Sequence, residues 1–146
     1  RPLATCTVWL AVDDANEENG CLKFIRGSHR DKNLKQHEFN KDKNLTLHQE
    51  LLKSEFNEKK SVNLILKRGQ ISLHDVYLVH GSDANLSSKS RRGMTMRFMP
   101  TTSVFDHNLA KEKYNNLNVS KYSNRKIYLA RGYDKSKRNN LEVVNF

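Results

Sequence analysis

The chain has 146 residues and a mass of 17.0 kDa, the size of one domain with a sizeable core. Hydrophobic residues make up only 36% of it, so we expect extensive turns and exposed loops. No apolar run is long enough to cross a membrane, and no secretory signal is present. The net charge of +10 raises the question of nucleic acid, but the Lys and Arg residues are scattered among Asn without a basic-aromatic stripe, which favours a solvated surface.

The two cysteines, Cys6 and Cys21, are too few for a disulfide framework, so we expect reduced thiols and a cytoplasmic location. The sequence begins Arg1-Pro2-Leu3 and enters a strand-like pattern within a few residues. We interpret this start as a cut through a domain, which makes the chain a fragment.

The first strand is expected at residues 4–12, ATCTVWLAV, because β-branched and aromatic residues dominate it with little polar alternation. Period two places Thr7, Trp9 and Ala11 on one face, a mixture of hydroxyl, indole and small residue that is typical of a cavity wall. The polar residues that follow end in Asn19-Gly20, a strong turn signal, so the chain is expected to return as a second strand.

Residues 30–60 differ from the rest because they are polar and contain neither Pro nor Gly. Leucines and a phenylalanine at helical spacing predict one helix in this insertion, at residues 45–57. Further strands are expected at residues 21–25, 61–66, 70–74, 76–80, 93–99 and 126–130, with a short helix at 107–114. Several short strands with one helical insertion predict an all-β antiparallel sandwich or barrel.

The chemistry is concentrated in residues 69–100, GQISLHDVYLVHGSDANLSSKSRRGMTMRFMP. His80 ends a predicted strand, Gly81 and Ser82 follow at once, and Arg91 precedes the next strand. An imidazole binds metal ions, a small residue beside it leaves room for a ligand, and a guanidinium binds the carboxylate at the ligand's far end. A single strand-end His is often only structural, and it is the neighbouring residues that favour a metal ligand here.

Two stretches together, TVWLAVDDANEENGCLKFIRGSH and ISLHDVYLVHGSDANLSSKSRRGMTMRFMP, resemble the phytanoyl-CoA dioxygenase family. The resemblance covers residues 4–105 and implies a double-stranded β-helix of the cupin (jelly-roll) type, here without its N-terminal strands. It implies Fe(II) as cofactor and 2-oxoglutarate as cosubstrate. The domain organisation that follows is a partial dioxygenase domain over residues 1–146, with a core at 4–105, the insertion at 30–60 and an extension at 106–146.

The resemblance also implies roles for four residues. His80 matches the family's second iron-binding histidine, and Arg91 matches the arginine that pairs with the distal carboxylate of 2-oxoglutarate. Ser82 matches a hydroxyl beside that carboxylate, and Trp9 matches an aromatic residue of the cosubstrate wall. Arg92 is the alternative to Arg91, since neighbouring strand residues point in opposite directions and only one can face inward.

The other two iron ligands of the family, a His-x-Asp pair before the Trp strand, are absent from the residues preceding Trp9. His29 and Asp31 have this spacing but follow the second strand, and His48 and Glu50 lie in the predicted helix, where side chains two apart diverge. We therefore expect the pair upstream of this sequence.

His74 is a further candidate ligand. In one extended strand it would lie about 20 Å from His80, too far to share a metal ion. A bend near Asp75 and Val76 would remove that limit. We otherwise interpret His74 as structural.

The predicted function is that of a fragment of an Fe(II)/2-oxoglutarate-dependent dioxygenase that hydroxylates a small molecule with O2. Alone, the fragment is expected to be inactive because the His-x-Asp ligands are missing. The alternatives from other classes are a non-catalytic β-helix module and a basic nucleic-acid-binding protein.

Overall fold

The computed structural model describes residues 1–42, 49–114 and 122–143. The chain divides into two compact units. We call Thr5–Gln36 with Leu51–Phe98 the sheet unit, and Arg1–Ala4, His37–Glu50 and Met99–Phe146 the terminal unit. All the candidate site residues named above that the structure describes, apart from Glu50, lie in the sheet unit.

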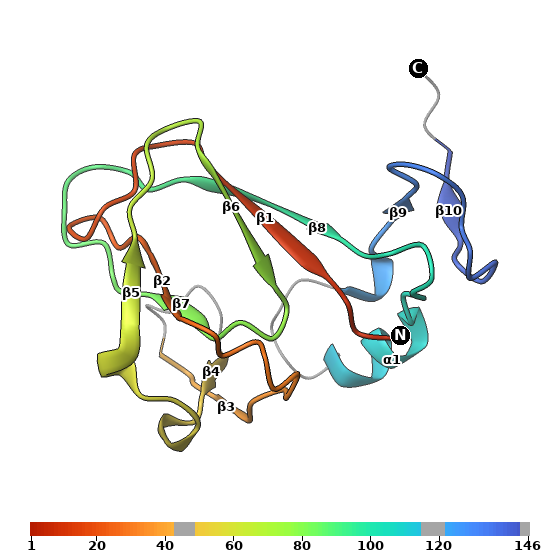
Figure 1. Ribbon diagram of the computed structural model, residues 1–146, viewed down its shortest axis with the longest axis horizontal. Helices are drawn as coiled ribbons and strands as arrows, with labels where there is room; N and C mark the ends of the chain where they lie inside the picture. Colours follow the sequence, from red (N-terminus) through yellow and green to blue (C-terminus); the bar gives the residue numbers. More distant parts are fainter. Residues whose placement is uncertain (43–48, 115–121, 144–146) are drawn as a thin grey trace. The chain divides into compact units, whose positions relative to one another are not determined.

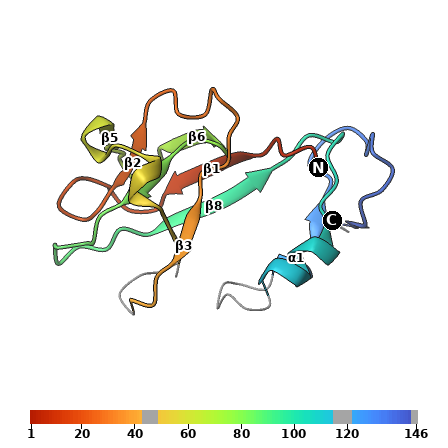
Figure 2. The same cartoon turned by 90° about the horizontal axis from the view of Figure 1, so that it is seen from below.

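The first sheet of the sheet unit has the order β6-β1-β8 and is antiparallel throughout (Figure 1). β1 (Cys6–Ala11) lies at its centre, between β6 (Ile71–Asp75) and β8 (Gly93–Phe98). Figure 2 shows β1 and β8 side by side along their length. The strands predicted at 4–12, 70–74 and 93–99 are confirmed in kind, with shifts of one or two residues at their ends.

The second sheet has the order β5-β2-β7 and is also antiparallel. β2 (Leu22–Ile25) pairs with β5 (Ser61–Leu64) on one side and with β7 (His80–Ser82) on the other. The two sheets meet through aromatic rings, since the Phe24 ring of β2 lies 5.4 Å from the His74 ring of β6. The sheet unit is therefore two small sheets that face each other, a mostly β architecture as predicted.

The loop between β1 and β2 closes the core of this unit. The Asn16 and Asn19 side chains each accept a hydrogen bond from the other residue's backbone N–H, at 3.1 and 2.8 Å. Gly20 adopts a left-handed φ of 72°, and a Cβ there would collide with the backbone oxygen of Asp83, so glycine is required. The buried cluster beneath is formed by Trp9, Ala11, Ala15 and Cys21, with Leu22 and Leu66 packed against it.

The predicted strand over residues 76–80 is wrong, because these residues form a turn and only His80 begins strand β7. Asp75 causes the difference. Its carboxylate accepts a hydrogen bond from the Tyr77 backbone N–H at 2.9 Å, and its carbonyl accepts one from the Leu78 N–H at 3.1 Å. A side chain that bonds the backbone two residues on favours a turn over a ladder.

The predicted helix over residues 45–57 is also wrong in its described part. Residues 49–51 form strand β4 (Gln49–Leu51), which pairs with β3 (His37–Phe39), and they are followed by the short 3-10 helices η1 (Lys53–Glu55) and η2 (Glu58–Lys60). The Leu52 N–H donates to the Gln36 carbonyl at 3.0 Å, a bond to a distant residue in place of one within a helix. Residues 45–48 lie outside the described residues.

The terminal unit contains α1 (His107–Tyr114), which confirms the helix predicted at 107–114. It also contains η3 (Tyr122–Asn124) and a parallel pair of two-residue strands, β9 (Ile127–Tyr128) and β10 (Leu141–Glu142), the former within the predicted strand at 126–130. The Asn139 side chain ties its segments together, donating to the Ser103 carbonyl at 2.9 Å and accepting from the Phe105 N–H at 3.0 Å. Within the described residues, no helix has the length and apolar character that crossing a bilayer requires.

Candidate functional site

The register of the two sheets defines which side chains face the space between them. Thr7 lies opposite His74 on one neighbouring strand and Arg97 on the other, and Trp9 lies opposite Ser72 and Thr95. Paired residues share a face. The inner face of β6-β1-β8 is therefore formed by Thr7, Trp9, Ser72, His74, Thr95 and Arg97. The facing surface of β5-β2-β7 is formed by Leu22, Phe24, Val62, Leu64, His80 and Ser82.

His80 begins β7, and its position is fixed by the end of β2 and by the corner that follows β2. Val79, its predecessor, accepts a hydrogen bond from the Ile25 N–H at 3.0 Å and donates its own N–H to the Ser28 hydroxyl at 2.8 Å. The Nδ1–H of His80 donates to the Leu78 carbonyl at 2.7 Å. A carbonyl only accepts, so Nδ1 carries a proton and Nε2 is the ring nitrogen that a metal ion would use.

Arg91 and Ser82 lie together on the same side of the unit. The Arg91 Nη2 is 3.5 Å from the Ser82 hydroxyl, the limit of a hydrogen bond. The Arg91 Nε is buried and has no partner. Arg91 therefore holds part of its guanidinium away from water without an anion to compensate it, which costs about 1–3 kcal/mol for such a donor.

Arg92 makes a different contact. Its Nε and Nη2 donate to the two carboxylate oxygens of Asp13 at 2.8 and 2.9 Å, and its backbone N–H donates to Asp13 at 2.8 Å. These hydrogen bonds lower the pKa of Asp13 to about 2. Arg92 is thus already paired, whereas Arg91 has an unpartnered donor.

Trp9 is buried, with 7% of its surface exposed, and belongs to the core cluster. Its indole lies against Gly93 of β8 so closely that any Cβ at that position would overlap the ring. Trp9 is consequently both a packing residue and part of the inner face, between Ser72 and Thr95.

His74 is the residue that the turn at 76–79 brings into the site. Its ring centroid lies 4.9 Å from that of His80, against the roughly 20 Å expected for an extended strand. Burial, followed by repulsion from His80 and Arg97, lowers the pKa of His74 to about 4. Its Nδ1 is buried without a partner. The Asx signal of Asp75 is the feature of the sequence that predicts this bend.

The other candidate ligands lie elsewhere. Asp31 pairs with Lys35 at 2.9 Å, and this hydrogen bond lowers the pKa of Asp31. Glu50 accepts a hydrogen bond from Asn40 at 2.6 Å, and His48 lies outside the described residues. Within residues 1–42, 49–114 and 122–143, no three His, Cys, Asp or Glu side chains gather closely enough to bind a metal ion.

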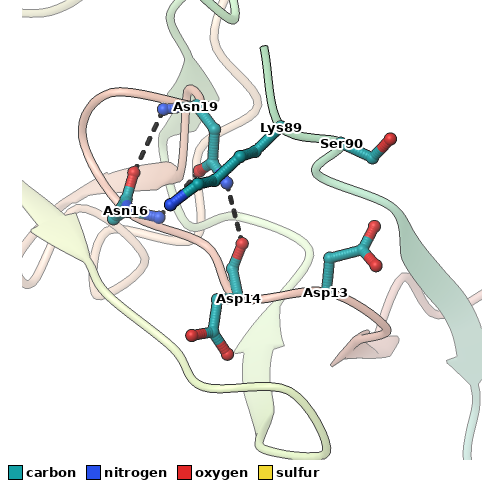
Figure 3. A pocket seen from close by; sticks show the side chains of 6 residues that line it. All are labelled: Asp13, Asp14, Asn16, Asn19, Lys89 and Ser90. Atoms are coloured by element: carbon teal, nitrogen blue, oxygen red, sulfur yellow. Dashed lines mark hydrogen bonds between the residues drawn. The ribbon is translucent and has the colours of Figure 1, made fainter. Parts of the chain in front are cut away.

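A polar hollow of about 330 Å³ lies on the β1–β2 loop, lined by Asp13, Asp14, Asn16, Asn19, Lys89 and Ser90 (Figure 3). Its two acids already have basic partners, since Asp13 binds Arg92 and Asp14 binds Lys67 at 3.2 Å. The hydrogen bonds between the Asn side chains and the loop serve the turn itself. None of its lining residues belongs to the inner faces defined above.

The unsatisfied polar atoms point to the space between the sheets. Among the described residues, the buried side-chain polar atoms without a partner are Ser72 Oγ, His74 Nδ1 and Arg91 Nε. Ser72 and His74 share the inner face of the first sheet, and Arg91 reaches Ser82 on the second. Buried polar groups are normally hydrogen-bonded, so these exceptions indicate positions where polar groups of a ligand would bind.

Comparison with known proteins gives the family context. The family model of phytanoyl-CoA dioxygenase (PhyH) matches residues 1–93. A phytanoyl-CoA dioxygenase domain-containing protein 1 homolog of Caenorhabditis briggsae is 36% identical over 97 residues, covering 63% of this chain and 33% of its own length. A homolog from Dictyostelium discoideum is 34% identical over 102 residues, covering 67% and 36%. The chain thus spans about a third of the length of these curated relatives.

Solved structures agree on the fold. The non-heme monooxygenase ThoJ in its apo form matches with a TM-score of 0.55 and 23% identity, covering 67% of this chain and 34% of that one. EvdO2 from Micromonospora carbonacea var. aurantiaca, complexed with 2-oxoglutarate, matches with a TM-score of 0.54 and 24% identity, covering 64% and 37%. At this level of identity the likeness establishes the fold alone.

Proposed function

The chain belongs to the phytanoyl-CoA dioxygenase family, and from that premise we propose that it is part of an Fe(II)/2-oxoglutarate-dependent dioxygenase. In this proposal the two facing sheets are part of a double-stranded β-helix whose other strands lie outside these 146 residues. The enzyme hydroxylates a small organic molecule. The free thiols of Cys6 and Cys21 suit the cytoplasmic location that we propose with it.

The roles proposed for individual residues follow from their contacts. His80 binds the iron through Nε2, for which its Nδ1–H bond to Leu78 prepares it. Arg91 and Ser82 bind the distal carboxylate of 2-oxoglutarate, and Trp9 forms the wall along which the cosubstrate lies. Iron held there would supply the oxidation, in which the substrate, O2 and 2-oxoglutarate would give the hydroxylated substrate, succinate and CO2.

The observation that carries the proposal is the unpartnered, buried Nε of Arg91 beside Ser82. A carboxylate placed there receives charge-assisted hydrogen bonds from a guanidinium, the strongest arrangement available for a dicarboxylate. The donor set therefore fits 2-oxoglutarate. It also favours Arg91 over Arg92, whose fork is occupied by Asp13.

Arg91→Gln and Arg92→Gln form a matched pair for testing this assignment, since both remove one neighbouring positive charge. We expect Arg91→Gln to weaken 2-oxoglutarate binding at least tenfold in calorimetric titration, and Arg92→Gln to leave it within about twofold. We call Arg91 and Ser82 the cosubstrate clamp. Equal effects of the two variants would contradict the role of Arg91 in this clamp.

Iron needs more than His80, because one imidazole does not hold a divalent ion against water and buffer. We propose that the remaining ligands, a His-x-Asp pair, come from sequence upstream of Arg1. Residues 1–146 with Fe(II), ascorbate and 2-oxoglutarate are then expected to form no succinate above a His80→Ala control. Adding the coding sequence upstream of Arg1 should restore His80-dependent succinate. A module that binds 2-oxoglutarate but stays inactive with that extension would be the non-catalytic alternative.

A further inference from the structure

One row of inner-face side chains has no role in the function proposed above. Thr7 lies opposite His74 on β6 and Arg97 on β8, so the three side chains cross the first sheet in one line. We call them the Thr7 row. His74 is buried, with 7% of its surface exposed, and its Nδ1 has no partner, whereas Arg97 at the other end is exposed. The Thr7 row therefore has a closed, buried end at His74 and an open, solvent-exposed end at Arg97.

The row lies beside His80 and away from the proposed cosubstrate clamp. The His74 ring is 4.9 Å from the His80 ring and 5.4 Å from the Phe24 ring, and Phe24 pairs with His80 across β2 and β7. Ser82, which contacts Arg91, is two residues further along β7 and pairs with Leu22. His80 thus separates two polar regions, of which the clamp is one and the Thr7 row is the other.

We propose that the Thr7 row binds an oxyanion, a carboxylate or phosphate group, of the organic substrate. The proposal rests on the function assigned to His80 and Arg91 above, and it names the class of substrate: an acidic small molecule whose charged group is held next to the metal-binding histidine. Arg97 at the open end admits the anion, and the imidazole of His74 holds it at the closed end.

The chemistry of the row favours an anion over a neutral or cationic group. A guanidinium, an imidazole and a hydroxyl offer hydrogen-bond donors, and guanidinium donates without ever accepting. The nearest carboxylate in sequence, that of Asp75, lies opposite Cys6 on the other face of the sheet and pairs with Lys32 at 2.9 Å. No acidic side chain belongs to either inner face as the register defines it for the described strands.

The test uses inorganic phosphate and acetate as probes and follows the backbone amides of the protein by NMR titration. The variants are Arg97→Gln, which changes an exposed side chain, and His74→Phe, which keeps a ring in the buried position. Arg26→Gln is the matched control, because Arg26 is also an exposed arginine of the sheet unit and lies outside both inner faces. Arg91→Gln is titrated in parallel with the same probes and with 2-oxoglutarate.

We expect one or both probes to bind saturably, with shifts centred on β1, β6 and β8. Arg97→Gln and His74→Phe should each weaken that binding at least fivefold, and Arg26→Gln should leave it unchanged. Preference for one probe identifies the substrate group as phosphate or carboxylate. The proposal is overturned if neither probe saturates, if Arg97→Gln binds like wild type, or if 2-oxoglutarate competes the probe away. Failure of the proposed function has a different signature, namely 2-oxoglutarate binding that is absent or indifferent to Arg91→Gln.

Discussion

The two faces of the β6-β1-β8 sheet have opposite and unexpected characters. The outer face is apolar, with Val8 opposite Leu73 and Met96, and Leu10 opposite Ile71 and Met94. It is also open, since Leu73 and Ile71 expose 65% and 53% of their surface. The inner face is polar and contains buried atoms without partners. In an ordinary half-buried antiparallel sheet the apolar face is the one that packs on the core.

The difference supports the proposal that the inner face binds a ligand, and it leaves an apolar surface open on the outer face. A buried polar atom without a partner costs about 1–3 kcal/mol, and an exposed apolar surface forgoes about 25 cal/mol for each Å² that could be buried. Both costs fall on the same sheet. Under the proposal made above, the cost on the inner face is that of keeping a binding site.

The largest expected effect on stability is at Trp9, the inner-face residue that packs in the core cluster. Trp9→Ala should lower the free energy of unfolding by about 3–5 kcal/mol, because it empties the centre of the core cluster. Chemical denaturation with far-UV circular dichroism measures it. Gly93→Ala is the companion variant, since its methyl group overlaps the Trp9 indole and should cost about 1–3 kcal/mol. In the Trp9→Ala background that second cost should vanish, and a cost that persists would show that Gly93 is required for another reason.

Ser72→Ala tests the polar part of the same face. Its Oγ is buried without a partner, so its removal should raise the free energy of unfolding by about 1 kcal/mol in the absence of ligand. The midpoint of urea denaturation reports this. A loss of stability of similar size would mean that the hydroxyl is satisfied in solution, and the contrast between the faces would be weaker than we describe.

Leu73→Lys makes the corresponding change on the outer face. With 65% of the side chain exposed, the free energy of unfolding should change by less than about 0.5 kcal/mol. Sedimentation velocity should at the same time show less self-association than in the wild type, because the apolar surface is interrupted by a charge. A large destabilisation would indicate that this face is already covered in the isolated chain.

The smallest expected effect is on the pH dependence of folding stability. Arg92 lowers the pKa of Asp13 from 3.8 to about 2, so the folded state holds the carboxylate charged where the unfolded state is protonated. This contribution to stability is fully present above about pH 4 and is lost as the pH falls towards 2. The wild type should therefore lose more stability than Asp13→Asn between pH 4 and pH 2 in thermal melts. Parallel pH profiles of the two proteins would show that the ion pair does not contribute.

Local sequence patterns predict much of this fold. The β-branched run at residues 4–12 contains β1, the strand predicted at residues 93–99 contains β8, and residues 107–114 form the predicted helix. Each of these patterns is local, and no distant competitor overrides it. Period two also places Trp9 on the inner face, because alternation is a property of the strand alone.

The wrong secondary-structure predictions occur where a hydrogen bond to a distant residue, or one to a side chain, determines the backbone conformation. The leucine spacing of residues 45–57 favours a helix, but Leu52 bonds Gln36 instead. Hydrophobic runs favour a strand through residues 76–80, but the Asp75 side chain makes a turn. The neighbouring rings of His74 and His80 follow from that turn, so the sequence predicts His80 as a ligand and leaves His74 apart from it. Whether His80, Arg91, Ser82 and Trp9 have their proposed roles stays a prediction for the binding experiments above.

The position of β1 has a consequence for how the protein is made. β1 is the first strand of this sequence and the middle strand of its sheet, yet its partners are residues 71–75 and 93–98. During translation these residues leave the ribosome at about 5–20 per second, so β1 waits several seconds with both edges and its indole unsheltered. Such long-range pairing makes folding slow and exposes the nascent chain to aggregation. Rare codons before residue 98 would lengthen that interval, and β1 would be a target for a chaperone that binds extended apolar segments.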